Sequence, residues 1–147
     1  MPPAGSGRSS ARISLRSDAR ELRKLRQQLT QFFDEHDVRP ELRDDLILVS
    51  NELATNAIEA SALGSDLVVE VHIGAAHITM AVENVGEPFD LPPELVLPDK
   101  THPRGRGLAL ISRIVDDLCA EPTVDGTRVI AKCRLVATSN AVTGQPR

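Results

Sequence analysis

Apolar residues recur at helical spacing in two stretches of the first half of the chain. Positions three or four residues apart predict a helix over 18–36, with Ser17 or Asp18 as its N-cap. A second helix is predicted to start at Arg39-Pro40-Glu41, because proline suits the first helical turn, and to run to about Ala62. The apolar positions of the first helix are Leu22, Leu25, Leu29 and Phe32 or Phe33.

Apolar and polar residues alternate elsewhere, which predicts half-buried strands. A proline-rich stretch over 85–103 has no periodicity, and a loop of that length in a small domain is usually functional or disordered. Strands and helices that do not strictly alternate favour an α+β fold, a two-layer sandwich. The remaining predicted elements are a strand at 11–16, a hairpin at 67–74 and 77–84, a helix over 105–118, and strands at 118–122 and 128–136.

Length and composition fit one soluble globular domain. The chain has 147 residues, 41% of them hydrophobic and 26% charged, which points to a single core. It has no Trp or Tyr and three Phe, so the core is expected to be aliphatic and a base-stacking nucleic-acid surface is disfavoured. The net charge of −4 gives no general attraction to nucleic acid or anionic membranes.

The chain ends and the cysteines complete this picture. Residues 1–10 and 137–147 are small and polar, and are predicted to be flexible tails. Cys119 and Cys133 lack metal-type spacing; two buried thiols in a reducing compartment are favoured, and a disulfide stays open. No membrane-length apolar run or signal-type region occurs, so a cytoplasmic location is expected. The basic cluster is interpreted as a solvated helix face: Arg20, Arg23, Lys24 and Arg26.

Two polar residues border the apolar stripe of the second helix. Glu52 and Asn56 are four residues apart, so they are neighbours at one edge of the stripe that includes Leu46, Val49 and Leu53. A charge and an amide there cost stability unless something pairs with them. Taken alone, the helix favours an ordinary amphipathic boundary, with Asn56 bonded to local backbone.

A second motif is "RGRGLAL", Arg104 to Leu110. Gly105 and Gly107 precede the predicted helix, whose free N–H groups could bind a phosphate that glycine allows to approach closely. Arg104 and Arg106 add positive charge. Alone, such a motif is typical of a flexible loop end. Two further motifs, "ENVGEPF" at 83–89 and "DGTRV" at 125–129, are by themselves ordinary turns.

Taken together and in their order along the chain, the four motifs resemble those of the GHKL family of ATP-binding domains, which includes histidine kinases and gyrase-type ATPases. They are most similar to those of the bacterial anti-sigma-factor serine/threonine kinases. "SNELATNAIEAS" matches the N box, "VENVGEPF" stands in the place of the first glycine box, and "RGRGLALISRIVDDL" matches the second. "DGTRVIAKCRL" matches the closing strand. The resemblance covers roughly residues 11–136.

The resemblance implies a two-layer α/β sandwich of the GHKL (Bergerat) type, with a mixed sheet covered on one face by helices. The ATP-binding domain would span 11–136, with a lid loop over about 86–104. It also implies an anti-sigma factor that phosphorylates a small STAS-type antagonist protein and sequesters a sigma factor. It is compatible with a homodimer.

The same resemblance assigns roles at the phosphate end of a nucleotide site. Asn56 would hold Mg²⁺ between the phosphates of ATP, since Mg²⁺ needs few protein oxygens. Glu52 would be the catalytic general base that accepts the proton of the attacking hydroxyl. The phosphates would be cradled by the second glycine box: Arg104, Gly105, Arg106, Gly107 and Leu108.

At the adenine end, the resemblance assigns Asn84, Gly86 and Thr127 to the nucleotide. The family usually has Asp where this chain has Asn84, and Gly where it has Pro88. Asn84 can still accept a hydrogen bond from the adenine amino group, without the charge-assisted component. Gly86 would permit close backbone approach to the base.

Two alternatives follow from these departures and from the motifs. One is a degenerate GHKL domain that acts as a protein-binding regulatory module with weak or no kinase activity. The other is a detached catalytic domain of a histidine kinase system. Glu52 argues against this last option, because histidine kinases usually lack a carboxylate at that place.

Overall fold

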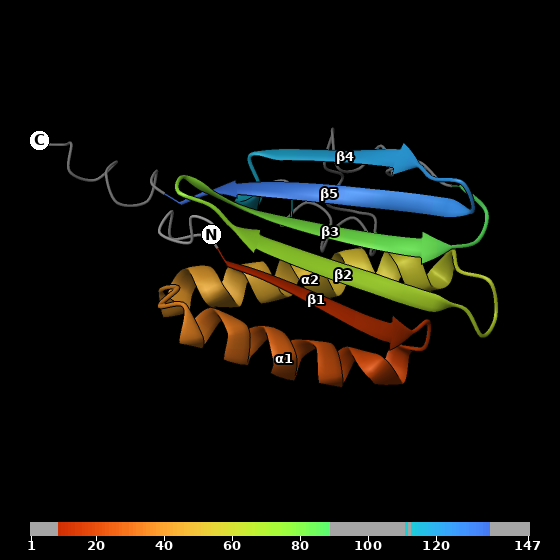
Figure 1. Ribbon diagram of the computed structural model, residues 1–147, viewed down its shortest axis with the longest axis horizontal. Helices are drawn as coiled ribbons and strands as arrows, with labels where there is room; N and C mark the ends of the chain where they lie inside the picture. The colour runs from red at the N-terminus through yellow and green to blue at the C-terminus, as the bar shows by residue number, and fades with distance from the viewer. Residues whose placement is uncertain (1–8, 89–110, 112, 136–147) are drawn as a thin grey trace, which may run out of the picture.

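The computed structural model describes residues 9–88, 111 and 113–135. Two helices lie side by side on one face of a five-stranded sheet, whose strand order is β1-β2-β3-β5-β4 (Figure 1). This is the α+β two-layer arrangement that the sequence predicts. The elements are β1 (Ser9–Arg16), a 3-10 turn (Ala19–Glu21), α1 (Leu22–Glu35), α2 (Pro40–Glu59), β2 (Asp66–Ile73), β3 (His77–Val85), β4 (Asp117–Pro122) and β5 (Gly126–Arg134).

The sheet is antiparallel at each of its four described pairings, so the expectation of a mixed sheet is wrong for these strands. The reason lies in the connection between β1 and β2, which contains two helices. A single crossover helix would return the chain to the start of β1 and give a parallel neighbour. A pair of helices returns it to the end of β1, as Figure 1 shows, and β2 then runs back alongside.

Helix boundaries follow local capping chemistry. The side chain of Asp18 accepts a hydrogen bond from the backbone N–H of Arg20 at 2.9 Å, which caps the 3-10 turn before α1. Pro40 occupies the first turn of α2, as predicted. α2 ends at Glu59, before the predicted Ala62, and Gly64 lies in the following turn at φ 78°.

The core lies between the helices and the sheet and is almost entirely aliphatic, as the composition predicts. α1 contributes Leu25, Leu29 and Phe33, all with no exposed surface. Alternate residues of each strand face the helices, so the period-two patterns select one buried face. The buried strand residues include Ile13, Leu15, Leu67, Val69, Val71, Ile78, Met80, Val82, Val129, Ala131 and Cys133.

Two expectations about the last third of the chain need correction. Leu118 was expected in a helix and lies in β4, because the helical residues Ile111, Arg113 and Ile114 are followed by a strand that begins at Asp117. Both cysteines are free thiols. Cys119 is exposed, whereas Cys133 is buried, and burial raises the pKa of the Cys133 thiol to about 12.

The sheet face away from the helices carries a chain of ion pairs. Arg12 and Arg128 both contact the Glu70 carboxylate, and Arg128 also reaches Glu83, at 3.3 Å. The Arg128 hydrogen bond is the main reason that the pKa of Glu70 lies below its ordinary value. Within the described residues, no helix has the length and apolar character needed to cross a membrane.

Candidate functional site

α2 places Glu52 and Asn56 one turn apart at the edge of its buried stripe. Both side chains are half-buried, while Val49, Leu53 and Ala57 between and beside them are buried against the sheet. We call Glu52 and Asn56 the α2 edge. The sequence predicted this juxtaposition from the helical period alone.

The α2 edge offers two kinds of oxygen. The Glu52 carboxylate makes no hydrogen bond or ion pair within the part of the chain that the structure describes. A half-buried carboxylate of this kind can accept a proton from an approaching hydroxyl. The Asn56 side chain supplies an amide oxygen, a ligand type that suits Mg²⁺.

Asn84 lies in a different environment, at the end of β3. The residue is 1% exposed, and its side chain makes three hydrogen bonds to neighbouring residues. Its amide nitrogen donates to the Ala57 carbonyl at 3.2 Å and to the Ser61 hydroxyl at 3.3 Å. Its amide oxygen accepts from the Thr127 backbone N–H at 2.9 Å. Asn84 therefore joins α2, β3 and β5.

The orientation of this carboxamide is fixed by its partners. A backbone carbonyl can only accept and a backbone N–H can only donate, so the nitrogen of Asn84 must face Ala57 and the oxygen must face Thr127. The Ser61 hydroxyl donates to the Ala57 carbonyl at 2.6 Å and accepts from Asn84, which completes a consistent network.

Two glycines allow the backbone to pack tightly around Asn84. A Cβ atom at Gly126 would lie 1.9 Å from the Asn84 carbonyl oxygen, and one at Gly86 would lie 2.3 Å from the Ala60 carbonyl oxygen. Gly86 also forms an isolated β-bridge with Ser61. Contact with the end of α2 thus requires glycine at position 86, and the expected approach of this glycine to a base stays a prediction.

We call this group the Asn84 cluster: Ala57, Ser61, Asn84, Gly86, Gly126 and Thr127. Thr127 is 1% exposed and lies opposite Asn84 in the β3–β5 register. Sequence reasoning selected Asn84, Gly86 and Thr127, but gave no role to Ser61 or Gly126. The "DG" pair that precedes Thr127 was the available signal for a tight backbone contact at Gly126.

The residues expected at the phosphates lie outside the described residues: Arg104, Gly105, Arg106, Gly107 and Leu108. Most of the expected lid over 86–104 does so as well. Within the described residues, the α2 edge and the Asn84 cluster are adjacent along α2, because Ala57 follows Asn56 directly.

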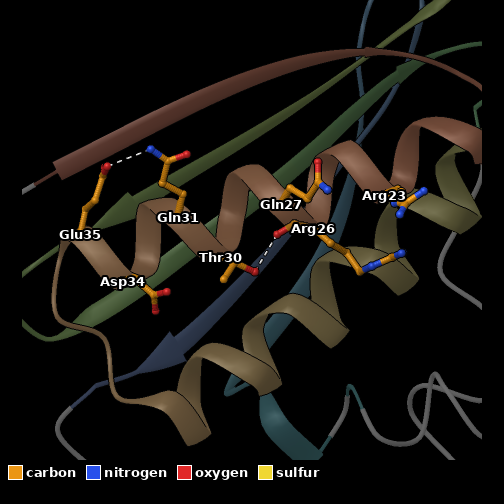
Figure 2. Close-up of a pocket in the computed structure, with 7 residues that line it drawn as sticks. All are labelled: Arg23, Arg26, Gln27, Thr30, Gln31, Asp34 and Glu35. Atoms are coloured by element: carbon orange, nitrogen blue, oxygen red, sulfur yellow. Dashed lines mark hydrogen bonds between the residues drawn. The ribbon is translucent and has the colours of Figure 1, made fainter.

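Two surface hollows lie elsewhere. One, of about 770 Å³, is lined by seven polar residues on successive turns of α1 (Figure 2). Arg23 and Arg26 line the end of the hollow near the start of α1, and Asp34 and Glu35 line the end near its C-terminus. The hollow therefore carries both signs of charge. The other, of about 370 Å³, lies over the ion pairs of the open sheet face. No group of His, Cys, Asp or Glu suited to hold a metal occurs among the described residues.

Comparison with known proteins identifies the family. A search of curated proteins finds no match for the chain. The family model described as "Histidine kinase-like ATPase domain" matches residues 15–133, which include both the α2 edge and the Asn84 cluster. Domains of this kind bind ATP, typically with Mg²⁺. A sandwich of helices on an antiparallel sheet and a match over most of the chain thus agree that this protein belongs to the histidine kinase-like ATPase domain family.

Proposed function

We propose that this protein is an anti-sigma factor with Mg·ATP-dependent serine/threonine kinase activity. Its substrate would be a small STAS-type antagonist protein, and it would sequester a sigma factor. The observation that supports this best is the α2 edge, where Glu52 presents a carboxylate without a described partner one turn from Asn56. The resemblance of the N box to those of anti-sigma-factor kinases supplies the substrate class.

In this proposal each residue of the α2 edge has one task. Glu52 accepts the proton of the Ser or Thr hydroxyl as it attacks, and its half-burial keeps the carboxylate beside the reacting group. Asn56 is the residue that would hold Mg²⁺, which supplies charge neutralisation to the phosphates when bound. The Gly105–Gly107 segment and its flanking arginines are proposed to cradle the phosphates.

Phosphoryl transfer from labelled Mg·ATP to a panel of purified STAS-domain proteins tests the proposal. We expect transfer with the wild type, and a loss of at least about 100-fold with Glu52→Gln, as removal of a general base predicts. Mg·ATP affinity of this variant should change little, because the change is isosteric. Glu41→Gln, an exposed position on the same helix, is the matched control. Equal transfer by Glu52→Gln and wild type would exclude the assigned mechanism.

A protein-binding regulatory module without kinase activity is the second candidate. The Asn84 cluster favours it, because a residue expected to contact the nucleotide is instead packed inside the protein. This candidate predicts sigma-factor binding that does not change on addition of Mg·ATP or with Asn56→Ala. Nucleotide-dependent binding would favour the kinase.

A further inference from the structure

The Asn84 side chain lies against the C-terminal end of α2. The last carbonyls of a helix have no partner within the helix and need one from outside. α2 has no basic residue in its last turn. The Ala57 carbonyl accepts from the Ala60 N–H at 3.2 Å and receives two further hydrogen bonds, from Asn84 at 3.2 Å and from Ser61 at 2.6 Å. Asn84 therefore acts as a C-terminal cap supplied by a neighbouring strand.

The same location explains an amide at this position. The C-terminal end of a helix carries partial negative charge. A carboxylate at position 84 would place one oxygen against the Ala57 carbonyl and that negative end, where neither oxygen has a hydrogen to donate. An amide places its N–H groups there. The Asn84 side chain therefore matches the protein groups around it better than aspartate would.

Asn84 has no free amide hydrogen with which a base could pair. Both amide hydrogens are used, the oxygen faces Thr127, and the residue is 1% exposed. Reversal of the amide is prevented by the Ala57 carbonyl. Adenine and guanine differ in the donor and acceptor at ring positions 1 and 6, and strong selection requires side-chain partners that are free to pair with them.

We infer that Asn84 is a positioning residue that holds the C-terminal end of α2, and with it Asn56, on the sheet, and that it does not read a base. Position 84 therefore contributes little to any selection between adenine and guanine. The selection part of the inference rests on the proposed function, since it needs a nucleotide to bind. The positioning part rests on the contacts of the Asn84 cluster.

Calorimetric titration of the full chain with Mg·ATP and Mg·GTP tests the selection. We expect Asn84→Asp to change the two dissociation constants by the same factor, within about threefold. A tenfold gain for ATP alone would show that position 84 reads the base and would overturn the inference. If neither nucleotide binds the wild type at millimolar concentration, the proposed function fails, and the selection part of the inference fails with it.

Amide hydrogen exchange tests the positioning without nucleotide. Asn84→Asp should speed exchange at the end of α2 and at the facing ends of β3 and β5 by at least tenfold. Asn51→Asp makes the same chemical change on the same helix, beside Arg26, and is expected to leave these amides unchanged. If Asn84→Asp does not fold, Ser61→Ala removes the two hydrogen bonds of the Ser61 hydroxyl but keeps the Asn84–Thr127 bond, and should give a smaller increase at the same amides. Unchanged exchange in the folded variants would overturn the positioning role.

Discussion

The α2 edge and the Asn84 cluster are neighbours on one helix, yet their polar groups are used in opposite ways. At the α2 edge, the Glu52 carboxylate is half-buried and has no described partner. At the end of the same helix, every polar group of the Asn84 side chain, which comes from β3, is buried and paired. An available group can act on something outside the protein, whereas a satisfied one holds the protein together. The motifs that resemble those of the family therefore contain residues of two different kinds.

The largest expected effect on stability comes from Gly126→Ala. The new Cβ would overlap backbone atoms of Asn84, so we expect a loss of more than about 3 kcal/mol, at the upper end for overpacking. Gly86→Ala should cost somewhat less, because its closest approach is longer. Gly64→Ala meets no atom within 4 Å and should cost about 1 kcal/mol from its positive φ. Urea unfolding checks this order, and equal losses for Gly126→Ala and Gly64→Ala would contradict a tightly packed cluster.

Asn84→Ala should mainly reduce stability, whereas Asn56→Ala should mainly weaken Mg·ATP binding. Loss of Asn84 removes the side-chain acceptor of the Thr127 N–H and one of the donors to the Ala57 carbonyl, so we expect about 2 kcal/mol of destabilisation. Asn56 is half-buried, so its loss should cost about 1 kcal/mol or less and should weaken Mg·ATP binding instead. Thermal unfolding and calorimetry read the two effects. A more severe stability loss from Asn56→Ala would reverse the comparison.

The ion pairs of the open sheet face show what polar contacts contribute when solvent reaches them. Because the pKa of Glu70 is lowered in the folded state, its pairing stabilises the protein above the ordinary carboxyl pKa and is lost as the pH falls through the folded value. Arg128→Met should therefore cost about 0.5–1 kcal/mol at pH 7, with a smaller difference from wild type near pH 3. Unfolding at both pH values tests this, and a pH-independent loss would point to packing of the Arg128 stem.

The smallest effect is expected at the exposed turn that joins β4 to β5. Val124 is fully exposed beside the Asn84 cluster in sequence, so Val124→Ser should change stability by less than about 0.5 kcal/mol. Urea unfolding against wild type is sufficient. A larger loss would show that the cluster extends beyond its hydrogen-bonded residues.

The sequence predicted those elements whose apolar residues recur with one clear spacing. Helical spacing predicted both helices and the juxtaposition of Glu52 with Asn56, and alternation predicted the strands. The antiparallel hairpin of β2 and β3 was predicted, whereas the periods did not decide how the other strands pair. The strand predicted at 118–122 begins one residue earlier, at Asp117, and the preceding helix was predicted too long because Leu118 continues its apolar spacing.

The role of Asn84 could not be predicted, because it depends on groups far away in the chain. The carbonyl of Ala57 and the N–H of Thr127 are 27 and 43 residues from it, and backbone groups leave no trace in side-chain patterns. The sequence alone offered one reason to note asparagine at position 84 where the family usually has aspartate, a weaker contact with the nucleotide. The hydrogen bonds to the end of α2 add a structural reason for an amide at this position.

The pairing of β1 with β2 has a consequence for how the chain folds. Ser10 and His72 are hydrogen-bonded across 62 residues of sequence, and both helices lie between them. During synthesis, β1 and its buried Ile13 and Leu15 leave the ribosome long before the strand that pairs with them. Such non-local pairing slows folding, since loop closure costs entropy before any contact forms. The edge of β1 is therefore the part of this domain that most needs protection from aggregation before synthesis is complete.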